Sequence, residues 1–95
     1  MTDHKNIAVL TTKGVFFENM PISYVFRHAD DGMWEFRENK DKVQDSEIRV
    51  VSLEEVINRD KTIREILDLP LGYYAFRIDC ESQWEIKPIQ TELLK

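Results

Sequence analysis

Apolar and polar residues alternate along two stretches of the chain, and each stretch has the two-residue period of a β-strand. The first spans residues 22–37 and is interrupted at residues 29–32 by Ala-Asp-Asp-Gly, a sequence typical of a turn. The second spans residues 73–86. Both therefore predict β-hairpins. Since Trp34 and Trp84 each begin the returning strand, we expect the core to form around these aromatic strands.

Two shorter apolar runs predict further strands. Residues 7–10 (Ile-Ala-Val-Leu) and 48–51 (Ile-Arg-Val-Val) each suit a short, largely buried strand. Residues 15–17 are expected to extend the first of these strands or to pack beside it.

Helical signals are confined to the segment between the two hairpins. Ser52 and Glu55 match a capping box, which predicts a short helix that starts directly after residue 52. Asp60 is a second N-cap candidate, and Pro70 ends the pattern. The apolar residues between these two positions recur at helical spacing: Ile63, Ile66 and Leu67.

Together these elements predict an α+β fold, with a mainly antiparallel sheet of about five to six strands and one or two short helices on one face. The length of 95 residues predicts a single domain over 1–95. Residues 38–47 are predicted to form an exposed charged loop, and residues 88–95 a frayed tail that follows Pro88.

The charge balance narrows the class of partner. Lys and Arg number 13 against 18 Asp and Glu, so the formal net charge is -5. This balance argues against nucleic-acid binding, which draws on a basic face, and it suits a basic protein partner. The sequence has no signal-peptide core and no apolar run near the length of a membrane span, so we expect a cytoplasmic protein without membrane contact.

Candidate chemistry is sparse. His4, His28 and the single cysteine, Cys80, do not show the spacing of a metal site, so we predict no metal and no cofactor. A thiol–imidazole pair of Cys80 and His28 is the one enzymatic alternative. Arg27 and Arg77 each end a Tyr-x-Phe-Arg strand and are interpreted as sheet arginines paired with nearby acids such as Glu35 or Glu85. The alternative is a fork that binds a carboxylate or a phosphate.

The strongest charge asymmetry lies in the segment from Asp30 to Arg49, which holds seven acids and four bases. An acidic hairpin and loop of this kind could face a basic partner. The alternative is a solvated loop without a partner. Five of these seven acids are the candidate partner-binding residues: Asp30, Asp31, Glu38, Asp41 and Asp45.

The order of several short motifs resembles a known family. The motifs cover roughly residues 22–77. They are Tyr24-x-Phe26-Arg27, Asp31-Gly32-x-Trp34-x-Phe36, Asp60-x-x-Ile63-x-x-x-Leu67-x-x-Pro70-x-Gly72, and Phe76-Arg77. In this order they resemble a family of small bacterial proteins that was long catalogued as a domain of unknown function. That family is now grouped with the immunity proteins of polymorphic toxin systems, as immunity protein family thirty-three.

The chain departs from the family pattern at two places. Met33 stands between Gly32 and Trp34, where family members tend to have Gly directly before Trp. Residues 37–40 (Arg-Glu-Asn-Lys) replace an acidic turn that often follows the second strand. If that turn belongs to the partner surface, its loss changes which partner is expected. The family resembles a binding domain, so the resemblance implies no catalytic residues.

Three hypotheses for the function follow. The first is a non-enzymatic immunity-type protein that binds a bacterial toxin and neutralises it by occlusion. The toxin is expected to be a basic protein. The second is a structural or regulatory interaction module of unknown partner, either a monomer or a homodimer formed through an exposed sheet edge. The third is an enzyme that uses Cys80 or His28, which would require a cleft and a perturbed thiol.

Overall fold

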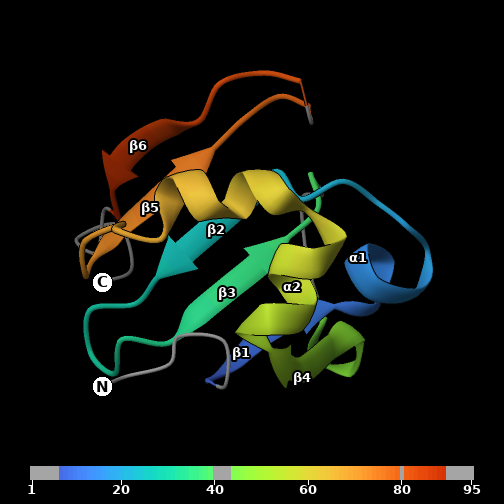
Figure 1. Cartoon of the computed structure of the whole chain (residues 1–95). Helices are drawn as coiled ribbons and strands as arrows, with labels where there is room; N and C mark the ends of the chain where they lie inside the picture. The colour runs from blue at the N-terminus through green and yellow to red at the C-terminus, as the bar shows by residue number, and fades with distance from the viewer. Residues whose placement is uncertain (1–6, 40–43, 80, 90–95) are drawn as a thin grey trace.

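The computed structural model describes residues 7–39, 44–79 and 81–89, which form one sheet with short helices packed on it (Figure 1). The strands are β1 (Ala8–Thr12), β2 (Tyr24–Arg27), β3 (Trp34–Arg37), β4 (Ile48–Ser52), β5 (Tyr73–Phe76) and β6 (Glu85–Pro88). The helices are α1 (Lys13–Phe17) and α2 (Leu53–Arg59), with the 3-10 segments η2 (Asp45–Glu47) and η3 (Lys61–Ile66).

The six strands follow the order β4-β1-β3-β2-β5-β6. All neighbouring pairs are antiparallel except β1 with β3, which are parallel and meet at Leu10 and Glu35. The parallel pair arises because the chain passes from β1 through α1 to β2 before it returns as β3. The prediction of an α+β fold with a mainly antiparallel sheet is confirmed.

The segment α2–η3 crosses one face of the sheet and joins the β4 edge to β5 (Figure 1). Both α2 and η3 begin at the N-cap residue that the sequence predicts. The Ser52 hydroxyl accepts a hydrogen bond from the Glu55 amide at 3.2 Å, and the Glu55 carboxylate accepts one from the Ser52 amide at 3.1 Å. The Asp60 carboxylate accepts a hydrogen bond from the Thr62 amide at 3.0 Å and starts η3.

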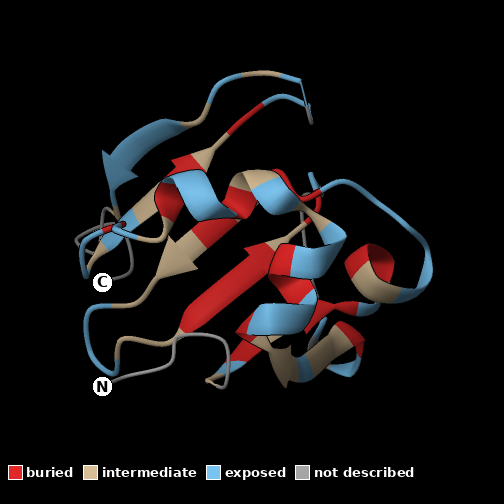
Figure 2. Cartoon of the chain, in the orientation of Figure 1, coloured by how far each residue is buried: buried red, intermediate tan, exposed pale blue. Residues whose placement is uncertain are grey.

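The hydrophobic core lies between this segment and the sheet. Val25, Phe36 and Ala75 point towards the helices and are fully buried, and β3 is buried at all its residues except Arg37 (Figure 2). Trp34 also belongs to this core, as predicted, while Trp84 packs against it and is half-buried.

Four other aromatic residues of the two hairpins lie on the opposite face of the sheet. Because side chains alternate along a strand, the residues next to Val25 and Ala75 must point away from the helices. These residues form a half-buried cluster in which neighbouring ring centroids are 4.8 to 5.9 Å apart. The cluster consists of Tyr24, Phe26, Tyr74 and Phe76. The core thus forms around the hairpin strands, as expected, but these four rings lie outside it.

The segment after β1 also differs from the prediction. Residues 15–17 belong to the helix α1 and do not extend the strand. The Thr12 side chain caps this helix by accepting a hydrogen bond from the Val15 amide at 3.2 Å.

The predicted loop and tail are more ordered at their described ends than expected. Glu38 and Glu47, at the two ends of the loop 38–47, are buried, and η2 forms before β4. Pro88 ends β6, and the next residue, Ile89, donates its amide to the Gly72 carbonyl at 2.8 Å. Residues 40–43 and 90–95 lie outside the described part of the chain.

Both edges of the sheet carry features that hinder further strand pairing at some of their positions. The hydrogen bond from the Ile89 amide to the Gly72 carbonyl shows that the backbone groups of Ile89 face β5. The backbone of the preceding residue, Pro88, therefore faces outward, and proline has no N–H that a further strand could bond. On β4, the outward amide of Ser52 is bonded to Glu55, and the outward carbonyl of Ile48 accepts a hydrogen bond from the Arg49 side chain at 2.9 Å. Such devices suppress edge-to-edge association.

No helix in the described ranges has the length and apolar character needed to cross a membrane.

Candidate partner-binding site

The β2–β3 turn is a rigid acidic turn. The Gly32 amide donates to the His28 carbonyl at 2.9 Å, and the His28 amide donates to the Met33 carbonyl at 3.1 Å. Gly32 has a φ of 72°, a conformation that favours glycine. The two acids also hold the turn, because Asp30 accepts the Asp31 amide and Asp31 accepts the Met33 amide, each at 2.9 Å.

A second loop, residues 67–72, is fastened to this turn. The Gly72 amide donates to the Arg27 carbonyl at 2.7 Å, and the Arg27 guanidinium donates to the Leu69 carbonyl at 2.9 Å. The same guanidinium lies over the Trp34 ring, 5.0 Å from its centroid. Residues 28–33 and 67–72 together form one end of the molecule, on the left of Figure 1, which we call the acidic tip.

The acidic tip carries a concentrated negative charge. Asp30, Asp31 and Asp68 are exposed, and neither loop contains a lysine or arginine. Leu71, in the second loop, has 52% of its surface exposed. An exposed leucine in two joined loops that also carry exposed carboxylates offers both apolar contact and charge complementarity to a basic protein.

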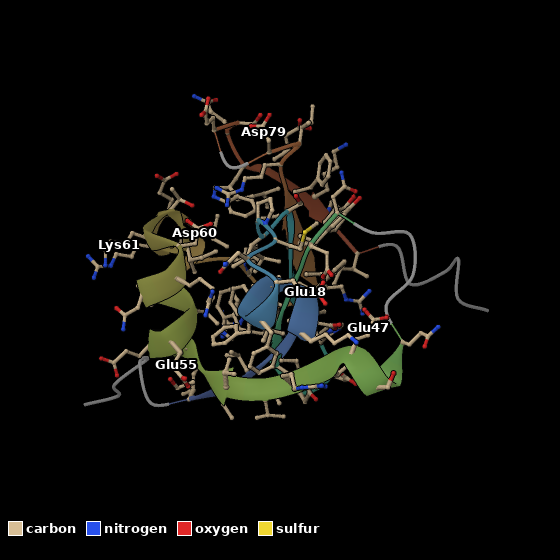
Figure 3. The ribbon with its side chains drawn as sticks, turned by 90° about the vertical axis from the view of Figure 1, so that its right-hand side faces the viewer. Glu18, Glu47, Glu55, Asp60, Lys61 and Asp79 are labelled. Carbon is tan, nitrogen blue, oxygen red and sulfur yellow. The ribbon has the colours of Figure 1, made fainter. Side chains whose placement is uncertain are left out.

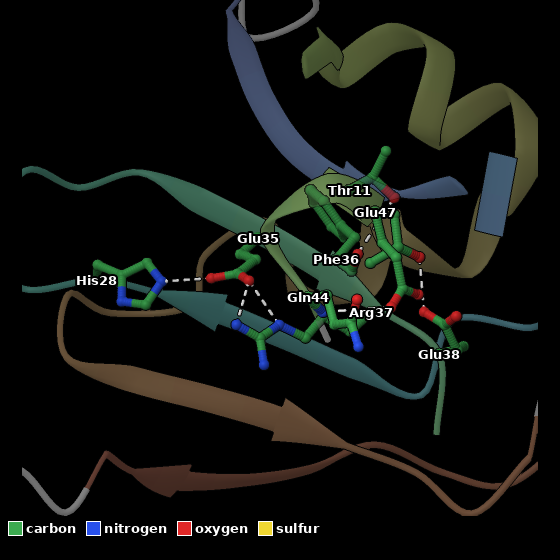
Figure 4. Close-up of polar contacts among 9 residues, drawn as sticks. Thr11, His28, Glu35, Phe36, Arg37, Glu38, Gln44 and Glu47 are labelled. Atoms are coloured by element: carbon green, nitrogen blue, oxygen red, sulfur yellow. Dashed lines mark hydrogen bonds and ion pairs between the residues drawn. The ribbon is translucent and has the colours of Figure 1, made fainter. Parts of the chain in front are cut away.

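A recess of about 440 Å³ opens beside the acidic tip on the face of the sheet away from the helices. Glu35 lies on the same face, with its carboxylate held between His28, whose Nε2 is 2.8 Å away, and the Arg37 guanidinium (Figure 4). Only 6% of the Glu35 side chain is exposed, so this network neutralises a buried carboxylate. The recess is lined by Phe26, His28, Ala29, Asp30, Arg37, Gly72 and Ile89.

The structure does not place all the predicted acids on one surface. Asp30 and Asp31 lie together on the acidic tip. Glu38 is buried, and its carboxylate accepts the Thr12 hydroxyl at 2.6 Å (Figure 4). A Cβ added to Gly14 would overlap this carboxylate, so Glu38 fills space inside the molecule. Glu38 is therefore not part of the candidate surface.

Two of the predicted acids remain, Asp41 and Asp45. Asp41 lies outside the described residues, and Asp45 is the first residue of η2. Sequence reasoning missed Asp68 and Leu71, which come from a distant part of the chain. The available signal was an apolar residue directly before Gly72, at a turn where an apolar side chain has little core to enter.

Arg77 has a different partner from the one expected. Its guanidinium is 1% exposed and pairs with Asp60, with further hydrogen bonds to the Thr62 hydroxyl at 2.8 Å and the Ile22 carbonyl at 2.9 Å. It also lies over the Trp84 ring, 4.1 Å from the centroid. Arg77 is thus structural, as interpreted, but it does not pair with a neighbouring sheet glutamate. Arg27 likewise bonds to a backbone carbonyl.

The described part of the chain adds no evidence for a metal site or for the enzymatic alternative. Among the residues described, no three His, Cys, Asp or Glu side chains are grouped so that they could hold a metal ion. Cys80, which the enzymatic alternative invokes, lies outside the described residues.

Comparison with known proteins returned no match to a family model, to a curated protein or to a solved structure.

Proposed function

We propose that this chain is a non-enzymatic binding protein of the immunity type, which neutralises a basic bacterial toxin by covering it with the acidic tip. One observation carries the proposal: two loops from distant parts of the chain are locked together, present three exposed carboxylates and an exposed leucine, and contain no lysine or arginine of their own. The resemblance of residues 22–77 to immunity protein family thirty-three supports the same reading.

The rigidity of the acidic tip is what makes it suited to binding. A surface that is already fixed by hydrogen bonds loses little conformational entropy when a partner docks. Its negative field would accelerate encounter with a basic protein, and Leu71 would be desolvated at the contact. Inhibition by occlusion needs no chemical step from the binding protein.

The second hypothesis, an interaction module that dimerises through a sheet edge, has less support from the structure. Pro88 blocks the outer edge of β6, and the capping of Ser52 by Glu55 occupies part of the β4 edge. An edge-paired dimer would need these devices to be displaced.

The proposal is tested by capture from an extract of the native host with the tagged chain. We expect a basic protein in equimolar amount, retained at low salt and released as salt rises. In the variant Asp30→Lys/Asp31→Lys, retention should fall by about tenfold or more, because like charges then face each other. The control is Glu65→Lys/Glu85→Lys, which makes the same change in net charge at exposed positions outside the tip. Equal retention by both variants would contradict the proposal.

A further inference from the structure

A second exposed surface lies at the end of the molecule opposite the acidic tip. Phe17, the last residue of α1, is 70% exposed, and Met20, in the connection from α1 to β2, is 43% exposed. Figure 3 looks onto this end, with Glu18 labelled near its centre. Aromatic and methionine side chains are enriched at protein interfaces, whereas a monomeric protein usually buries them.

This α1–β2 loop, residues 17–21, is held in one conformation. The Met20 amide donates to the Gly14 carbonyl at 3.0 Å. Asn19 adopts a φ of 57°, and its side-chain carbonyl accepts a hydrogen bond from the Arg59 guanidinium at 3.0 Å. The exposed Phe17 and Met20 side chains are therefore presented by a fixed backbone.

A hollow of about 290 Å³ opens on the Met20 side of the loop. An engineered cavity of about 150 Å³ is enough to hold benzene, so this hollow can receive a phenyl ring. Phe17 does not line this hollow, so the exposed ring and the hollow are separate features of the same loop. The hollow is lined by Val15, Asn19, Met20, Pro21, Ile22, Arg59 and Asp60.

The charges around the loop have both signs. Arg49 and Arg59 lie over the Phe17 and Phe16 rings, at 6.0 and 4.4 Å from the centroids. Glu18, which directly follows Phe17, is exposed, and Glu55 lines a neighbouring depression with Arg59. A surface of mixed sign can face a copy of itself, whereas two acidic tips would repel each other.

We propose that two copies of this chain pair about a two-fold axis at the α1–β2 loop, with Phe17 of each copy in the hollow beside Met20 of the other. A two-fold contact requires a self-complementary surface, and an exposed ring and a separate hollow on one loop can meet this requirement. Both sheet edges carry features that hinder strand pairing, which leaves side-chain surfaces such as this one for self-association.

The inferred pair is small and concentration-dependent. A contact made mainly by one short loop buries less than the roughly 1,200 Å² of a standard interface, so it is transient. It would leave both acidic tips free at opposite ends of the dimer (Figure 1), and such a dimer would bind a multivalent partner with avidity.

Sedimentation velocity from micromolar to near-millimolar concentration tests the proposal at physiological salt, where charges beyond about 8 Å are largely screened. The weight-average mass should rise from 11.3 kDa towards twice that value. Phe17→Ser should remain near the monomer mass and should keep the circular dichroism of the parent, because the side chain is exposed. The control Val50→Ser removes a side chain that is 66% exposed elsewhere and should dimerise like the parent.

Complementation distinguishes this geometry from other ways of dimerising. Phe17→Ser lacks the ring but keeps the hollow, and Met20→Glu keeps the ring but places a carboxylate at the hollow. Neither variant should dimerise alone, but an equimolar mixture should regain part of the association through one intact contact. A monomeric parent protein at all concentrations would overturn the proposal. So would a dimer that survives Phe17→Ser, or a mixture that regains nothing.

Discussion

The buried guanidinium of Arg77 ties three parts of the chain together. It contacts the Asp60 cap of η3, the Ile22 carbonyl before β2 and the Trp84 ring before β6. The sequence indicates that Asp60 is a cap and that Arg77 is structural, because both signals are local. It does not pair the two residues, since their contact depends on how η3 lies across the sheet.

Replacing Arg77 with Met should lower the free energy of unfolding by about 3 kcal/mol, because Asp60 then loses its charge partner in a largely buried position. The lower end of the usual range applies since 18% of the Asp60 side chain is exposed. Urea denaturation measures this change. The control Arg64→Met removes an exposed arginine of η3 and should change stability by less than about 0.5 kcal/mol. Similar losses in both variants would contradict the assigned role of Arg77.

The elements differ in how far their own sequence predicts them. The start of α2 is predicted correctly because Ser52 and Glu55 make their bonds within one helical turn. The helix α1 is not, because its five residues include Gly14 and two phenylalanines, and it depends on Thr12 and the packing of Glu38 against Gly14.

The strands themselves are predicted well, but the face that each side chain occupies is not. Apolar residues occur on both faces of β2, so alternation alone cannot show which face the helices cover. Only one of the two loops of the acidic tip was predicted from the sequence, for a similar reason. Asp30 and Asp31 belong to one recognisable turn, whereas Asp68 and Leu71 join them only through long-range bonds between Arg27 and the second loop.

We predict that Pro88 prevents further strand pairing at the β6 edge. Pro88→Val restores an outward N–H and adds a strand-favouring side chain, so the variant should form large species as concentration rises. Light scattering measures this, in the Phe17→Ser background so that the loop contact does not contribute. The control Lys87→Val adds the same side chain to β6 but leaves the proline in place, and it should scatter like the background protein. Equal light scattering by the two variants would show that the proline does not protect the β6 edge.

For the molecule as a whole, the two exposed surfaces lie at opposite ends of the sheet and have opposite character (Figure 1). The acidic tip has one sign of charge and suits a basic partner, whereas the α1–β2 loop has both signs and suits a second copy of the chain. Failure of one proposal leaves the other intact, because no residue belongs to both surfaces.

Hydrogen exchange of the chain, alone and with the protein that it captures, tests the central claim most directly, because it locates the contact without any substitution. We predict that residues 28–33 and 67–72 exchange more slowly in the complex, while β6 and the α1–β2 loop are unchanged. Protection confined to β6 or to the α1–β2 loop, with the acidic tip exchanging as in the free chain, would contradict the account.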